Sequence, residues 1–281
     1  PSTSLSATSA MGALRAPSLL LLVGCARALV PTASSRRARA SLPSLALGAT
    51  RQTHALTSSD GDRSECLELP TKHENRRTFV FRESAMLTIE TCSFYEGKLG
   101  HAIWPAAVAA AIWAGDRPEL FDGKTVLELG SGVGTFGIAV AALTPAKRVV
   151  LSDLDAVDER DFDAPTGLLS AQRRNAANNG LESVSSMRLD WDDAGSWGNE
   201  TYDVVLAADC VFWPHLFDPL LDTLGRLRRR NPDATLLISC THRLGRTAEF
   251  LRRVAARGWV AAAAPRPDRP GAANTDVYEL R

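Results

Sequence analysis

The sequence predicts an α/β fold with a mainly parallel sheet, and three observations support this fold class. Short apolar runs alternate with helical segments through most of the chain, as in strands joined by crossover helices. One junction between a strand and a helix, at residues 125–137, is rich in glycine, and two apolar runs end in an acidic residue. An alternating segment near residue 80 adds a small N-terminal β-hairpin extension to this sheet.

Composition divides the chain into a leader at residues 1–59 and a folded domain at residues 60–281. The leader has six arginines but neither lysine nor acid, which is typical of a targeting segment. Its apolar run at 19–23 and the Ala-Arg-Ala at 26–28 resemble a signal peptide, and the Ser- and Arg-rich stretch behind them resembles a transit peptide. Such a pair indicates a plastid protein, with a mitochondrial presequence or a disordered tail on a cytoplasmic protein as alternatives. The run is too short for stable membrane insertion.

Charge and cysteine content narrow the function classes. Outside the leader the chain holds 26 basic and 32 acidic residues, a balance that disfavours nucleic-acid binding and suits a basic protein partner. The five cysteines are an odd number without CxxC spacing, which disfavours a disulfide scaffold and a zinc site. We expect a monomer without a bound metal.

The elements follow in order from apolar periodicity and from their end signals. Strands are predicted at Thr78–Arg82, Ala85–Thr91, 126–129, Arg148–Asp153, Ser186–Trp191, Tyr202–Asp209, Ala234–Cys240 and Val277–Leu280. Helices are predicted at 106–114, Phe136–Leu143, Gly167–Asn179, Leu216–Arg229 and Thr247–Arg257. Pro105 suits a first helical turn, Asn179-Gly180 ends a helix, and the arginines at 228–230 suit a helix C-terminus.

The junction at 125–137 predicts a ligand site. Its strand is followed by a turn with almost no side chains, where the backbone can approach a ligand and free amides at the helix start can accept a negative group. We expect Gly130, Ser131, Gly132 and Gly134 to hold a nucleotide-like cofactor.

Two cofactor classes fit this loop. Gly132 to Gly137 matches the GxGxxG dinucleotide fingerprint, a weak signal when taken alone. Glu128, two residues before the first glycine, is awkward beside a diphosphate but would attract the ammonium group of S-adenosylmethionine. Asp153 ends the next strand about twenty residues on, where a carboxylate can take two ribose hydroxyls; Asp155 is the alternative. The sequence therefore favours S-adenosylmethionine.

Six separated pieces of the domain have an order and spacing more specific than any one of them. They are Trp104-Pro-Ala, Glu128 to Gly134, Ser152-Asp153, Asn175 with Asn179, Leu189-Asp-Trp191, and Ala208-Asp-Cys-Val-Phe212. Together they resemble the class I methyltransferases of the family 16 protein-lysine methyltransferases. The resemblance implies a seven-stranded Rossmann-like sheet with the last strand antiparallel. It also implies a cofactor site lined by Trp104, the loop glycines, Asp153, Trp191 and Ala208.

The resemblance further implies methyl transfer to a lysine of a protein substrate. We assign the catalytic positions to Asp209, which would orient the lysine ammonium, and to Phe212, which with Trp213 would pack the lysine stem and the sulfonium. His215 is a weaker candidate for a proton acceptor. The family signature Asp-x-x-Tyr is here Asp209-Cys-Val-Phe212, a form that resembles the calmodulin-lysine methyltransferase branch.

Three alternatives stay open. The acceptor could be a small molecule or an arginine side chain. The chain could be a non-catalytic protein that binds S-adenosylmethionine or assembles with a partner, a hypothesis favoured by Phe212 in place of Tyr. A dehydrogenase with a nicotinamide cofactor is the third.

Overall fold

The computed structural model describes residues 66–69, 76–81, 85–91, 99–154, 167–264 and 274–281. The expected leader and the segment with Asp155 lie outside these residues. No helix in the part of the chain that the model describes is long and apolar enough to cross a membrane.

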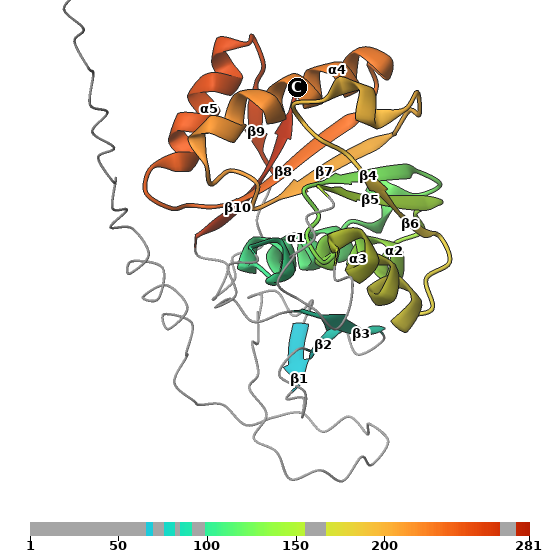
Figure 1. Cartoon of the computed structure of the whole chain (residues 1–281). Coiled ribbons are helices and arrows are strands. Elements are labelled where there is room, and N and C mark those ends of the chain that lie inside the picture. The colour runs from blue at the N-terminus through green and yellow to red at the C-terminus, as the bar shows by residue number, and fades with distance from the viewer. Residues whose placement is uncertain (1–65, 70–75, 82–84, 92–98, 155–166, 265–273) are drawn as a thin grey trace, which may run out of the picture. The chain divides into compact units, whose positions relative to one another are not determined.

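A seven-stranded sheet forms the centre of the domain (Figure 1). Its strands are β4 (Thr125–Leu129), β5 (Arg148–Asp153), β6 (Val184–Arg188), β7 (Val204–Ala208), β8 (Thr235–Thr241), β9 (Ala261–Ala263) and β10 (Thr275–Leu280). They lie in the order β6-β5-β4-β7-β8-β10-β9, with β4 to β8 parallel and β10 antiparallel to both of its neighbours. The predicted fold class, with its antiparallel last strand, is confirmed.

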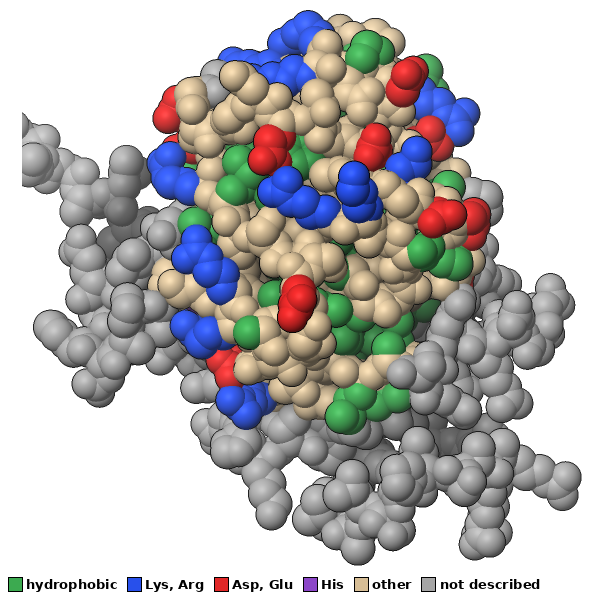
Figure 2. All heavy atoms as spheres, turned by 90° about the vertical axis from the view of Figure 1, so that its right-hand side faces the viewer, with side chains coloured by type: hydrophobic (Ala, Val, Ile, Leu, Met, Phe, Trp, Pro, Cys, Tyr) green, Lys and Arg blue, Asp and Glu red, His purple; other side chains and the backbone are tan. Residues whose placement is uncertain are grey.

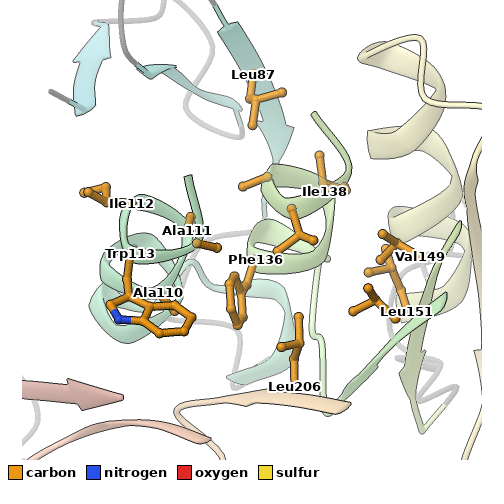
Figure 3. Close-up of a cluster of buried hydrophobic side chains, with 14 of the residues drawn as sticks. Leu87, Ala110, Ala111, Ile112, Trp113, Phe136, Ile138, Val149, Leu151 and Leu206 are labelled. Carbon is orange, nitrogen blue, oxygen red and sulfur yellow. The ribbon is translucent and has the colours of Figure 1, made fainter. Parts of the chain in front are cut away.

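Five helices cover the two faces of this sheet. They are α1 (Pro105–Gly115), α2 (Thr135–Leu143), α3 (Leu168–Asn178), α4 (Phe217–Arg230) and α5 (Arg246–Ala256). In Figure 1, α1 to α3 lie on one face and α4 and α5 on the other. Two buried cores result, because side chains alternate across a strand: Val126 joins the core under α1 and α2, and Leu127 the core under α4. Figure 3 shows the first core, where Phe136 of α2 lies near Leu206 and Trp113.

Two short strands and one boundary differ from the prediction. β9, three alanines long, and the N-terminal strand β1 (Cys66–Leu69) were not predicted. The third strand of the main sheet is Val184–Arg188 instead of Ser186–Trp191, so Trp191 lies in the loop that follows. β6 is an edge strand whose residues are half-buried or exposed, so it lacks the apolar run by which buried strands are recognised.

A separate three-stranded antiparallel sheet contains β1, β2 (Arg76–Phe81) and β3 (Ala85–Glu90), so the predicted hairpin is confirmed and extended by one strand. Asparagines at the C-terminal end of helix α3 bond to this sheet, and two of them, Asn175 and the capping residue Asn179, pair with the backbone of β3. Asn175 accepts from the Glu90 amide (2.7 Å) and donates to the Glu90 carbonyl (3.1 Å), and Asn179 makes the same pair of bonds with Thr88 (2.9 Å each). One helical turn spans about the same length as two strand residues, so these side chains pair with β3 as a neighbouring strand would.

Candidate active site

The glycine loop follows β4, at the carboxyl end of the parallel strands, and it can be formed only with glycines. Gly130, Gly132 and Gly134 have φ values of 59°, 54° and 88°, a region that costs other residues strain. A Cβ on Gly132 would lie 2.5 Å from the carbonyl oxygen of Gly100, and one on Gly130 would lie 2.8 Å from the sulfur of Cys210. The glycines are therefore required by close packing within the chain, and the approach of this backbone to a ligand stays a prediction.

Side chains beneath the loop fix its shape. Ser131 donates from its amide (3.0 Å) and from Oγ (3.1 Å) to the Ser152 carbonyl at the end of β5. Gln172 of α3 donates to Ser131 Oγ and to the Gly132 carbonyl, both at 2.9 Å. Gln172 is fully buried, and its Oε1 has no hydrogen-bond partner among the described residues. It was not predicted, although it lies three residues before Asn175, a spacing that places both on one helix face.

Glu128 supports the loop from inside the fold. Its side chain is buried, and its Oε2 accepts a hydrogen bond from the Gly137 amide (2.8 Å) in the first turn of α2. Burial raises its pKa to about 8, an effect that the Gly137 bond reduces and that nearby Asp153 increases. The alternation along β4 explains this orientation, because Glu128 shares a face with Val126, which packs under α2. Direct contact between Glu128 and a ligand ammonium stays a prediction.

Asp153 lies against the glycine loop, as the sequence predicted. Its Oδ2 accepts from the Gly132 amide (2.7 Å) and its Oδ1 from the Leu154 amide (2.8 Å). Burial raises the pKa of this carboxyl to about 6, against the lowering effect of the two amides. Each oxygen keeps a further lone pair with which it can accept from a ribose hydroxyl.

The remaining predicted cofactor residues lie around this loop or toward the end of β7. The Trp191 ring would be 3.2 Å from a Cβ on Gly130, so the indole covers the start of the loop. Ala208 is the last residue of β7, beside the ends of β4 and β8. Trp104 precedes α1 and donates from Nε1 to the Leu99 carbonyl (3.0 Å).

Asp209, the first residue after β7, is held by a residue that was not predicted. Arg243, in the loop between β8 and α5, donates from Nη1 to Oδ1 and from Nη2 to Oδ2, both at 2.8 Å. The Asp209 side chain is 4% exposed and the Arg243 side chain is 18% exposed. Asp209 (φ 57°) and Leu244 (φ 49°), beside Arg243, are the two non-glycine residues with positive φ in the described part of the chain. Nothing in the local sequence pattern singles out Arg243.

Aromatic rings surround this ion pair. The Arg243 guanidinium lies 5.4 Å from the centre of the Trp104 ring and 6.0 Å from that of Phe212. Phe212 packs edge-on against Trp213, with ring centres 4.8 Å apart, and Trp213 is 45% exposed. The structure therefore brings Trp104, Asp209 and Phe212 together, while His215 is exposed, with its ring centre 6.1 Å from that of Trp213.

The site fits the predicted S-adenosylmethionine. The order of strands reverses at β4, which pairs with β5 on one side and β7 on the other, and ligands of open α/β sheets bind at that position. The loop whose glycines no Cβ could replace and the acid at the end of β5 both lie there. Among the described residues, no group of three or more His, Cys, Asp or Glu side chains could hold a metal ion.

Similarity to known proteins agrees with this site. The chain is 29% identical over 156 residues to a calmodulin-lysine N-methyltransferase of Arabidopsis thaliana, covering 54% of this chain and 48% of the relative. It is 28% identical over 170 residues to the protein-lysine N-methyltransferase EEF2KMT of Homo sapiens, covering 58% and 52%. The chain thus spans about half the length of these relatives.

Solved structures and a family model complete the comparison. The CcbJ methyltransferase from Streptomyces caelestis has 16% identity and a TM-score of 0.45, covering 65% of this chain and 97% of that one. A model of the family described as lysine methyltransferase matches residues 82–257. That match covers more than half of the sequence, and the chain therefore belongs to the lysine methyltransferase family.

Proposed function

We propose that this protein transfers a methyl group from S-adenosylmethionine to a lysine side chain of a protein substrate. The observation that carries the proposal is the hydrogen bond from the Gly132 amide to the Asp153 carboxylate, because it holds the acid that we assign to the ribose hydroxyls against the glycine loop, where the strand order reverses. Membership of the lysine methyltransferase family supports the choice of acceptor.

On the cofactor side, the residues of the chain bind and orient S-adenosylmethionine. Asp153 accepts from the ribose hydroxyls, and Trp191 covers the adenine end of the loop. Glu128 and Gln172 act from beneath, because they hold the backbone of the loop and of α2. When bound, S-adenosylmethionine would supply an electrophilic methyl carbon on its sulfonium, with S-adenosylhomocysteine as the neutral leaving group when an amine attacks in line.

On the acceptor side, the chain aligns the amine. Asp209 accepts an N–H of the lysine through a lone pair that Arg243 leaves free. Phe212 and Trp213 pack the aliphatic stem and turn aromatic faces to positive charge. Holding both reactants in a near-attack geometry supplies on the order of several kcal/mol of the barrier reduction.

Two other acceptors and one non-catalytic role compete with this proposal. A small molecule or an arginine side chain would use the same cofactor site. Nucleic acid is disfavoured by the acidic balance of the domain, and the face in Figure 2 shows basic and acidic side chains interspersed. A role in assembly without catalysis is favoured by one observation, that Phe212 stands where the family signature has a tyrosine hydroxyl.

Calorimetric titration of the full chain with S-adenosylmethionine, S-adenosylhomocysteine and NAD tests the cofactor. We expect the first two to bind and NAD not to bind. Asp153→Ala should lose the binding, whereas Asp222→Ala, which removes an exposed acid on α4 that pairs with Arg257, should keep it. Binding of NAD alone would instead establish the dehydrogenase alternative.

Radiolabelled methyl transfer tests the acceptor. Unmethylated calmodulin is the first substrate to try, followed by plastid and cytosolic extracts, with acid hydrolysis to identify the methylated amino acid. We expect methyl-lysine from the wild type and a loss of about a hundredfold or more with Asp209→Ala at unchanged cofactor affinity. A variant as fast as the wild type would remove Asp209 from the mechanism.

We also propose an organellar, plastid location, supported by the arginine-rich and acid-free composition of residues 1–59. A fluorescent protein fused to the C-terminus of the full chain should accumulate in plastids. A diffuse cytoplasmic signal would contradict this location without affecting the enzyme activity.

A further inference from the structure

The acceptor side of the site already contains a cation. Arg243 makes two 2.8 Å bonds to Asp209 and lies over Trp104 and Phe212, so a carboxylate and two aromatic rings surround its guanidinium. These are also the groups that bind a lysine ammonium. The incoming lysine therefore meets a carboxylate whose charge is already balanced.

The backbone around this pair is built to keep it in place. Of the two non-glycine residues with positive φ in the described ranges, one is Asp209 itself and the other, Leu244, directly follows Arg243. Beside Arg243, His242 lies 2.5 Å from Oδ2 of Asp276 on β10, and the Asp209 amide donates to the Ser239 carbonyl of β8 (2.8 Å). Strained backbone persists where surrounding contacts determine it, and it is concentrated at functional sites.

The chemistry of methyl transfer gives this pairing a use. The amine attacks with its lone pair, so the lysine must lose its proton before the carbon–nitrogen bond forms and the carbon–sulfur bond breaks. A buried carboxylate without a counter-ion would favour the charged ammonium and oppose this loss. A carboxylate paired with a guanidinium still accepts an N–H but presents little net charge.

We propose that Arg243 is a positioning residue of the acceptor site, which neutralises Asp209 and fixes its orientation so that the target lysine is received as an uncharged amine. The proton of the ammonium passes to solvent, and the amine then donates an N–H to Asp209. This inference rests on the proposed function, since it concerns the acceptor of the same reaction.

The other titratable groups near the pair do not replace Arg243. Cys210 and Cys240 lie beside Asp209, and burial raises the pKa of both thiols, which keeps them neutral. His242 is paired with Asp276 of β10, which also accepts a hydrogen bond from the Tyr278 hydroxyl (3.2 Å). Asp153 and Glu128, on the cofactor side, are acids whose pKa burial raises, and neither supplies a cation. His215 is exposed, with its ring near that of Trp213.

The test uses n-butylamine, which carries the lysine side chain without a backbone. Its binding to the full chain saturated with S-adenosylhomocysteine is measured by calorimetry from pH 7 to pH 9, below the pKa of about 10.4 that an alkyl amine shares with lysine. If only the uncharged amine binds, the apparent affinity of the wild type rises about tenfold per pH unit.

Three variants separate the roles of Arg243. Arg243→Gln should bind the ammonium, so its affinity should be nearly constant over this pH range and exceed that of the wild type at pH 7. Arg243→Lys keeps the cation and should retain most of the rise with pH. Arg246→Gln removes a half-buried arginine three residues on, which pairs with Glu249, and should behave as the wild type.

Several outcomes would overturn the proposal. These are a wild-type affinity that does not depend on pH, an Arg243→Gln variant that keeps the tenfold rise, and a wild type that binds S-adenosylhomocysteine but no butylamine. If Arg243→Gln bound more tightly by the same factor at every pH, Arg243 would merely occlude the site. Failure of the wild type to bind S-adenosylhomocysteine is a different result, because it contradicts the proposed function itself.

Discussion

The cofactor side and the acceptor side of this site hold their acidic residues by different means. On the cofactor side, Glu128 and Asp153 accept hydrogen bonds from backbone amides, and burial raises the pKa of both. On the acceptor side, Asp209 is held by the Arg243 guanidinium. Among the described residues, no cation pairs with the two acids of the first arrangement, whereas Arg243 supplies one in the second.

The backbone shows the same contrast. Positive φ values on the cofactor side belong to glycines, which adopt them without strain, whereas on the acceptor side they belong to Asp209 and Leu244. The cofactor side is therefore defined by the sheet and a local glycine pattern. The acceptor side depends on a loop from β8 to α5 that approaches only in the folded chain.

The largest effect should come from Glu128→Gln, which removes a buried acid of the cofactor side and keeps its shape. The pKa of Glu128 is about 8 in the folded protein, against an ordinary value of 4.5 for an exposed glutamate, so the unfolded chain releases this proton first as pH rises. Between these pH values the folded state binds more protons, and its stability falls as pH rises. Relative to the wild type, the variant should gain about 4 kcal/mol of unfolding free energy between pH 4.5 and pH 8.

Urea denaturation at several pH values measures this difference. Glu182→Gln, which changes an exposed acid just before β6, is the control and should leave the pH dependence as it is. If the free energy of unfolding depended on pH in Glu128→Gln as it does in the wild type, Glu128 would be ionised at neutral pH and its burial would be compensated by a cation.

Gly132→Ala should have the next largest effect, because it tests whether the cofactor side depends on its glycines. The added Cβ would meet the Gly100 backbone at 2.5 Å in a left-handed conformation. We expect a loss of about 3 kcal/mol in stability and at least about tenfold in cofactor affinity. Gly123→Ala, where φ is 66° and nothing lies within 4 Å, should cost only about 1 kcal/mol. Stability is measured by thermal unfolding and cofactor affinity by calorimetry. If Gly132→Ala and Gly123→Ala lost the same amount of each, backbone strain, and not the close approach to Gly100, would determine the effect.

The same contrast explains how much the sequence could predict. The glycine loop and Asp153 were found because a strand, a turn and a helix lie in one continuous segment, and the acid ends the next strand. The orientation of Glu128 under α2 was not predicted, although a period of two along β4 places it on the same face as Val126. Arg243 could not be found, since its partner lies 34 residues earlier in the chain and only the parallel pairing of β7 and β8 brings them together.

Phe212→Tyr should have the smallest effect, and it tests the acceptor side at its one departure from the family signature. Phe212 is half-buried beside Trp213, so a hydroxyl can reach solvent and should change stability by less than about 0.5 kcal/mol. If Asp209 and Arg243 already align the amine, the variant should transfer methyl groups within about threefold of the wild-type rate, because it removes none of their contacts.

The comparison between the two sides fails if that small change has a large result. A rise of tenfold or more in methyl transfer, at unchanged affinity for S-adenosylmethionine, would mean that the acceptor side lacks a hydroxyl that catalysis needs. That outcome would favour the role of an assembly protein with a retained cofactor site. Phe212→Leu is the matched control, since it removes the aromatic face without adding a donor. If the rate of methyl transfer falls in Phe212→Leu and is unchanged in Phe212→Tyr, the contribution of this position is the aromatic ring that packs against the lysine stem.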